Sequence, residues 1–193
     1  MKYDRSTFKE HLASFKNVPR DELYKLSSEI APSDGLILEF GVASGHSINL
    51  IAEHLAPRTV YGFDSFEGIT ESWNGMGPGA FACPVPDVSD NVVLVKGLFQ
   101  DVLDDFVLQH TGAKIAYLHI DSDLYSSCKY VLETLDHMII PGTIIQFDEL
   151  CGYGTWEDHE FKAFNEYLET SGNDCEIIAC DHTTFQQVIC KIV

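Results

Sequence analysis

The chain has 193 residues, of which 45% are hydrophobic and 22% are charged, which suits one folded domain with a sizeable core. Its 12 lysines and arginines against 30 acidic residues give a formal net charge of -18, which disfavours binding to nucleic acid or to anionic membranes. No apolar stretch is long enough to span a bilayer, and the first residues lack the apolar core of a signal peptide. We therefore expect a cytoplasmic protein.

The first part of the chain predicts two short helices, around residues 8–15 and 22–30, before Pro32 and Gly35 end the pattern. From there, apolar runs typical of strands alternate with amphipathic stretches typical of helices. The expected strands cover residues 36–40, 59–63, 91–95, 114–120 and 142–147, and the expected helices cover residues 47–55, 99–110, 126–138 and 160–170. Strands that are apolar on both faces and alternate with helices predict a parallel sheet covered on each side.

The end of the chain departs from this alternation. Residues 175–180 and 185–193 are two strand-like runs with a short turn between them, which predicts an antiparallel hairpin at one edge of the sheet. The expectation is a seven-stranded, mostly parallel α/β sheet in a single domain over residues 1–193, with residues 1–35 as N-terminal helices.

Residues 65–90 form the longest predicted connection and hold four of the 14 glycines and three of the seven prolines. A connection this long in a compact domain is usually functional or disordered. Because it follows a strand end, we interpret it as a lid or substrate loop, with a plain surface insertion as the alternative. Trp73 and Phe81 are the residues in it that would close over a substrate, unless they are simple packing anchors.

The segment LEFGVASGHS places an acid and two glycines at the end of the first predicted strand. In open parallel sheets, this is the turn at which the backbone approaches a ligand closely. A dinucleotide fingerprint would require glycine at positions 41, 43 and 46, where this chain has Gly41, Ala43 and His46. An NAD site therefore fails at two of three positions, and a plain tight turn remains the simpler alternative.

An acid two residues before the first glycine fits a different ligand. Glu39, Gly41 and Gly45 resemble the first motif of class I S-adenosylmethionine-dependent methyltransferases, E/D-x-G-x-G-x-G, with Ala43 in place of the middle glycine. That cofactor carries an ammonium and a sulfonium and no phosphate, so a carboxylate near the turn would attract it.

The next strand ends supply further candidates for nucleoside binding. Asp64 ends the second predicted strand, where an acid can accept hydrogen bonds from both ribose hydroxyls, although it also suits a cap for its own loop. Gly97 and Phe99 follow the third strand, where an adenine ring needs a small turn and apolar walls. The expected cofactor-binding residues are Glu39, Gly41, Gly45, Ser47, Asp64, Ser65, Phe66, Gly97, Phe99 and Asp121.

Four acids follow the fourth and fifth predicted strands: Asp121, Asp123, Asp148 and Glu149. Consecutive strand–helix units place these ends on one edge of the sheet, where the carboxylates would repel each other unless a cation neutralised them. Magnesium prefers such oxygen ligands. His119 alternates with Asp121 and points the same way, but a histidine inside a strand is more often a packing residue.

Taken in order, FGVASG, GFDSFEG, KGLF, HIDSDLYSS and GTIIQFDE resemble the metal-dependent O-methyltransferases of the macrocin type, which act on antibiotic sugars, and more distantly the catechol-type enzymes. The likeness covers residues 36–150 and implies a Rossmann-like class I methyltransferase fold that uses S-adenosylmethionine. It also implies magnesium, or another divalent cation, held by Asp123, Asp148 and Glu149. Asp121 or Asp123 would be the catalytic base. The chain is short for that family, and its acid pair is Asp-Glu.

This resemblance implies O-methylation of a small-molecule hydroxyl by an in-line displacement, on an acceptor with two adjacent oxygens such as a sugar-like diol or a catechol-like group. Loop histidines offer spare bases at His46, His159 and His182. Neither nucleic acid nor a membrane is expected as a partner, and the sequence leaves a homo-oligomer open.

Two other classes of protein compete with this interpretation. Asp121-Ser122-Asp123 is a D-x-D pattern that would let a nucleotide-sugar glycosyltransferase hold a metal against a diphosphate. A non-catalytic nucleoside-binding protein would keep the fold but has no need of all the strand-end acids, which are present.

Overall fold

A computed structural model describes residues 2–193 and contains one eight-stranded sheet in the order β1-β7-β8-β6-β5-β2-β3-β4. Neighbouring strands are parallel except β8, which runs antiparallel to both β6 and β7. The strands are β1 (Lys16–Asn17), β2 (Leu36–Phe40), β3 (Val60–Asp64), β4 (Val92–Lys96), β5 (Ile115–Ile120), β6 (Ile144–Phe147), β7 (Cys175–Cys180) and β8 (Val188–Ile192).

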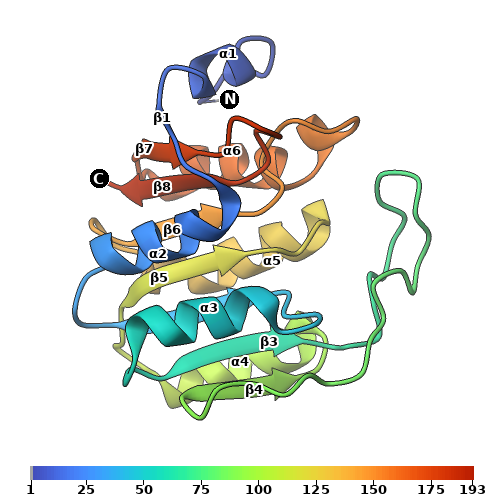
Figure 1. The fold of residues 1–193 in the computed structure, drawn as a ribbon, viewed down its shortest axis with the longest axis vertical. Helices are drawn as coiled ribbons and strands as arrows, with labels where there is room; N and C mark the ends of the chain where they lie inside the picture. Colours follow the sequence, from blue (N-terminus) through green and yellow to red (C-terminus); the bar gives the residue numbers. More distant parts are fainter. Residues whose placement is uncertain (1) are drawn as a thin grey trace.

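Helices cover both faces of this sheet, with α2 and α3 on one side and α4, α5 and α6 on the other (Figure 1). The short helix α1 lies near β7 at one end of the sheet. The helices are α1 (Phe8–Leu12), α2 (Arg20–Ile30), α3 (His46–Leu55), α4 (Phe99–Gln109), α5 (Tyr125–Leu135) and α6 (Glu160–Ser171), with 3-10 turns at Asp136–Met138 and Trp156–Asp158. None of the helices in the part of the chain described here has the length and hydropathy of a membrane span.

The predicted mixed sheet with a C-terminal antiparallel hairpin is confirmed, but the number of strands is eight rather than seven. The additional strand is β1, whose two residues pair in parallel with β7, so the hairpin does not form the edge of the sheet. A strand of two residues is too short to show a hydrophobic period in the sequence, and β1 is recognised only by its pairing with β7. That residues 1–193 act as one domain stays a prediction.

The central strands are buried on both faces, as the continuous apolar runs predicted. All six residues of β5 are buried, whereas the edge strand β4 is only partly covered. Parallel pairing brings the carboxyl ends of β2, β5 and β6 to one edge. There the Asp121 amide donates to the Phe40 carbonyl at 2.8 Å and the Asp148 amide donates to the Ile120 carbonyl at 2.9 Å. The predicted site residues after these strands therefore lie side by side.

Candidate active site

The turn after β2 needs its first glycine because another strand end crowds it. Gly41 has φ +95°, and a Cβ at this position would lie 1.7 Å from the Asp121 carbonyl oxygen. No side chain fits there. Gly41 therefore lets the glycine turn and the acid-bearing turn after β5 lie in direct contact. Both turns line the same cavity.

Asp64 fastens this turn from the end of β3. Its Oδ2 accepts hydrogen bonds from the Val42 and Ala43 amides at 2.9 and 2.8 Å, and its Oδ1 accepts one from the Phe66 amide at 2.7 Å. The carboxylate thus caps its own loop, as one of the two interpretations of Asp64 held, and it also joins that loop to the glycine turn. Asp64 still lines the neighbouring cavity, so both roles are open to it.

A cavity of about 360 Å³ opens at the carboxyl ends of the parallel strands, within the size range of small-ligand sites. Six of the ten expected cofactor residues line it: Gly41, Asp64, Ser65, Gly97, Phe99 and Asp121. Four do not. Gly45 precedes α3 as its N-cap with φ +82°, Ser47 and Phe66 are buried beside the turn, and Glu39 is completely buried in β2.

The apolar wall of the cavity lies where the third predicted strand end was expected to hold an adenine ring. Gly97 turns the chain after β4, and Phe99 begins α4 with its ring 5.1 Å from that of Phe40, edge to face. Leu98 lies between these two residues in the sequence and also lines the cavity. Its side chain is 39% exposed, so it offers apolar surface to a ligand in the cavity.

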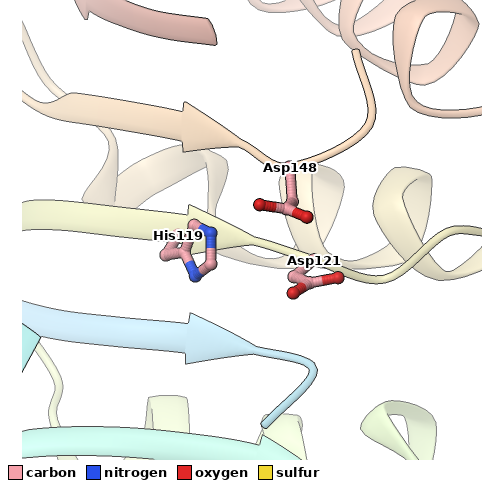
Figure 2. Close-up of side chains that lie close together, drawn as sticks. All are labelled: His119, Asp121 and Asp148. Atoms are coloured by element: carbon pink, nitrogen blue, oxygen red, sulfur yellow. The ribbon is translucent and has the colours of Figure 1, made fainter. Parts of the chain in front are cut away.

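The acids form two adjacent groups that share Asp121. Asp121, Asp123 and Glu149 each offer one ligand atom within 4.8 Å of the others, and so do His119, Asp121 and Asp148. Figure 2 shows the second group, with His119 on β5, Asp121 just beyond its end and Asp148 beyond the end of β6. All three predicted metal ligands line the cavity, but Asp123 and Glu149 belong to one group and Asp148 to the other.

The acids facing one another hold protons more tightly than usual. Burial and then the neighbouring Asp148 charge raise the pKa of Asp123 from 3.8 to about 7. The same two causes, in the same order, raise the pKa values of Asp121 and Glu149 well above their ordinary range. Asp123 also has a left-handed backbone conformation, with φ +58°, which is a strained conformation of the kind that clusters at functional sites.

Arg20 supplies a positive charge that the sequence did not indicate. Its guanidinium donates to Asp148 Oδ2 at 2.6 Å, while Tyr24 donates its hydroxyl to Asp148 Oδ1 at 3.3 Å. Desolvation is the largest single effect on the pKa of Arg20 and lowers it, but Asp148, Tyr24 and Asp121 together outweigh this and raise the pKa above its ordinary value. Arg20 is the one basic side chain among the described residues that line the cavity. No local pattern predicts a contact between residues 128 positions apart.

Glu39 does not line the cavity and pairs with His119. The two residues are direct partners in the β2–β5 register, and His119 Nδ1 lies 2.7 Å from Glu39 Oε1. Both side chains are completely buried, and Tyr24 packs its ring edge to face against the imidazole, with the ring centres 5.3 Å apart. His119 is thus a packed strand histidine, although its Nε2 has no hydrogen-bond partner among residues 2–193.

Glu160 is a second residue, after Arg20, that sequence reasoning did not assign to the site. It is the first residue of α6, is completely buried, and accepts hydrogen bonds from the Ser122 amide at 3.1 Å and the Glu149 amide at 3.2 Å. Burial raises its pKa to about 8, although the Ser122 hydrogen bond works against this shift. Its only signal in the sequence is an acid in the first turn of a helix, which usually means a favourable charge near the helix N-terminus.

Residues of the long connection line the cavity, and the connection extends away from the sheet (Figure 1). Trp73 and Phe81 both line the cavity, and Trp73 is nearly buried with its ring 5.2 Å from that of Tyr153. Phe81 is 50% exposed. This arrangement suits either a lid or a packing anchor, and the lid stays a prediction.

The spare histidines lie outside the cavity wall. His46 Nε2 is 3.2 Å from Asp21 Oδ1 at the surface, His182 stacks on Phe185, and His159 precedes α6. None of the three lines the cavity.

A mostly parallel sheet with a glycine turn, a strand-end acid and a ligand-sized cavity at its carboxyl edge defines the class I methyltransferase fold. The sequence of residues 38–150 matches the family described as methyltransferase domain. This match spans more than half of the chain, and the chain belongs to that family.

Solved structures of low sequence identity share the fold. The calicheamicin methyltransferase CalS11 is 22% identical with a TM-score of 0.69, and the match covers 97% of this chain and 80% of that one. The O-methyltransferase NovP is 22% identical with a TM-score of 0.66, covering 89% and 78%. An O-methyltransferase from Bacillus cereus is 17% identical with a TM-score of 0.61, covering 100% and 93%. A search of the curated proteins found no match.

Proposed function

We propose that this methyltransferase transfers a methyl group from S-adenosylmethionine to a hydroxyl of a small molecule, with a divalent cation at the strand-end acids. The observation that carries the proposal is that one cavity brings together the Gly41 turn, Asp64 and the acids after β5 and β6. A cofactor and an acceptor would then lie next to each other, as a direct transfer requires.

The cofactor would bind in the half of the cavity formed by the ends of β2, β3 and β4. Gly41 lets the backbone come close, Asp64 offers carboxylate oxygens to the ribose, and Leu98 and Phe99 offer apolar surface to the adenine. The structure with SAH from Bacillus cereus and that of TomG with SAM share this fold, which supports the choice of cofactor.

A divalent cation suits the donors of the other half. Glu149 Oε2 is buried without a hydrogen-bond partner in the described chain, and burial and then the Asp148 charge raise the pKa values of Asp121 and Asp123 beside it. Asp121, Asp123 and Glu149 would hold the ion, with Asp148 adjacent. When bound, it would supply a positive charge that lowers the pKa of an acceptor hydroxyl.

The acceptor would be a molecule with two adjacent oxygens, such as a sugar-like diol or a catechol-like group. Asp121 or Asp123 would take the hydroxyl proton, and Trp73 and Phe81 would cover the acceptor and exclude water. One structural neighbour is titled a TDP-rhamnose 3'-O-methyltransferase, which favours a sugar-like acceptor.

Calorimetric titration with S-adenosylmethionine and, separately, with UDP-glucose tests the cofactor, each with magnesium and with a chelator. We expect S-adenosylmethionine to bind under both conditions and Asp64→Asn to weaken it. Asp105→Asn, at an exposed position of α4, is the matched control and should leave binding unchanged. Binding of UDP-glucose alone, and only with magnesium, would instead favour a glycosyltransferase.

The cation is tested with Glu149→Gln, because Glu149 is one of the three proposed ligands. We expect this variant to lose turnover that depends on magnesium while it still binds S-adenosylmethionine. If magnesium-dependent turnover were untouched, the metal assignment would be wrong.

A further inference from the structure

Glu160 lies outside residues 38–150, the region that matches the methyltransferase family. It begins α6, which packs on the face of the sheet away from α2, and its side chain has no exposed surface. The residue does not line the cavity, so it touches neither cofactor nor acceptor.

Each oxygen of the Glu160 carboxylate is bound to a different acid-bearing turn. Oε1 accepts from the amide of Ser122, which lies between Asp121 and Asp123, at 3.1 Å. Oε2 accepts from the amide of Glu149, which follows Asp148, at 3.2 Å. One buried side chain therefore joins the backbones that carry all four acids.

Both turns need such support. Asp123 has φ +58°, a left-handed conformation that persists only when its surroundings impose it. The acids on the two turns also repel each other, which pushes the turns apart. The two amides are directed at different oxygens of one carboxyl group, which can accept a hydrogen bond at each.

We propose that Glu160 is a positioning residue that fixes the spacing between the Asp121–Asp123 turn and the Asp148–Glu149 turn, and with it the geometry of the cation and acceptor centre. This inference rests on the proposed function for the role of that centre. The hydrogen bonds themselves do not depend on it.

Glu160→Gln is the direct test, because glutamine has the same shape but only one acceptor oxygen. One amide would then face the side-chain NH2 group. We expect the affinity for Mn2+ to fall about 10- to 100-fold, as when a residue that orients metal ligands is lost. We expect S-adenosylmethionine affinity to stay within about 2-fold, because the Gly41, Asp64 and Gly97 side of the cavity is not in contact with Glu160.

Hydrogen exchange gives a readout that needs no metal. Exchange of the Ser122 and Glu149 amides should become at least about 10-fold faster in Glu160→Gln, with the strand amides of the core unchanged. Glu166→Gln, in the same helix but paired with Lys129 and Tyr125, is the matched control and should leave both amides and Mn2+ binding as in the wild type.

The outcomes separate the two proposals. If the wild-type protein binds no Mn2+, the metal proposal fails, and the exchange of the two amides alone decides the role of Glu160. Wild-type exchange at Ser122 and Glu149 in Glu160→Gln would overturn the positioning role. If Glu160→Gln does not fold, Glu160→Asp carries the same test, because a side chain shorter by one methylene reaches only one amide.

Discussion

The two halves of the cavity differ in how their acids are compensated. On the cofactor side, Asp64 accepts three backbone hydrogen bonds, from Val42, Ala43 and Phe66, so the position of its side chain is fixed before any ligand arrives. On the acceptor side, Asp121, Asp123 and Glu149 face one another with raised pKa values. The acid of one half is held by backbone amides, whereas the acids of the other half face one another beside Arg20, the one basic side chain among the described residues that line the cavity.

The largest effect is expected from breaking the acceptor half alone. Asp123→Asn should lower turnover with magnesium by about 10²- to 10⁴-fold, the usual range for loss of a proton acceptor. Steady-state kinetics with calorimetry checks this, and S-adenosylmethionine affinity should change little because the cofactor half is intact. An Asp123→Asn enzyme with wild-type turnover would remove Asp123 from the chemistry.

Breaking the cofactor half should affect both binding and folding. Asp64→Asn leaves one acceptor oxygen for three amides, and an unsatisfied buried donor costs about 1–3 kcal/mol. We expect S-adenosylmethionine to bind about 10- to 100-fold more weakly and the free energy of unfolding to fall by a similar amount, about 1–3 kcal/mol. Calorimetry and urea unfolding measure the two. A variant that loses affinity but no stability would show that the three amide bonds do not hold the turn.

The pH dependence of stability should report two acids on the acceptor side, Asp123 in the cavity and Glu160 behind it. Burial raises the pKa of Glu160 from 4.5 to about 8 and that of Asp123 from 3.8 to about 7, so the folded chain keeps protons that the unfolded chain has released. Stability is therefore greatest at low pH in this window and falls as pH rises through these values, by a few kcal/mol between about pH 5 and pH 8.

Urea unfolding of the metal-free protein at the two pH values measures this difference. Magnesium should reduce it, because the ion replaces the protons. A free energy of unfolding that rises with pH would contradict the raised pKa values of Asp123 and Glu160.

The smallest effect is expected at Ala43, in the glycine turn. Ala43 has φ +43°, where a side chain is strained and glycine is not. Ala43→Gly should stabilise the protein by up to about 1 kcal/mol, because relief of strain exceeds the entropy that glycine loses. Urea unfolding checks this. Destabilisation of that size would show that the Ala43 methyl group packs usefully.

The sheet was predictable from the sequence because each parallel strand has its own apolar run and each run ends at a turn. The strands after residue 35 start and end within a few residues of their expected positions. The acids were predictable for the same reason, since strand ends share an edge. Glu39 shows where this reasoning stops: its spacing before Gly41 suggested a ligand contact, but the β2–β5 register pairs it with His119.

Arg20 and Glu160 could not be predicted because their partners lie far away in the sequence. Asp148 is 128 positions from Arg20, and Ser122 is 38 positions from Glu160. Neither contact follows from a period or a motif. Both depend on how helices from different layers pack at the edge of the sheet.

The position of Arg20 and Glu160 on either side of residues 38–150 bears on how this enzyme could be recombined with its relatives. A chimera that transplants only the family-matched core would carry the acids without the guanidinium and the carboxylate that hold them. We expect such hybrids to keep the cofactor residues and the four acids but to lose the flanking contacts to the acid-bearing turns. Residues 2–35 and 151–193 should therefore be transferred together with the core.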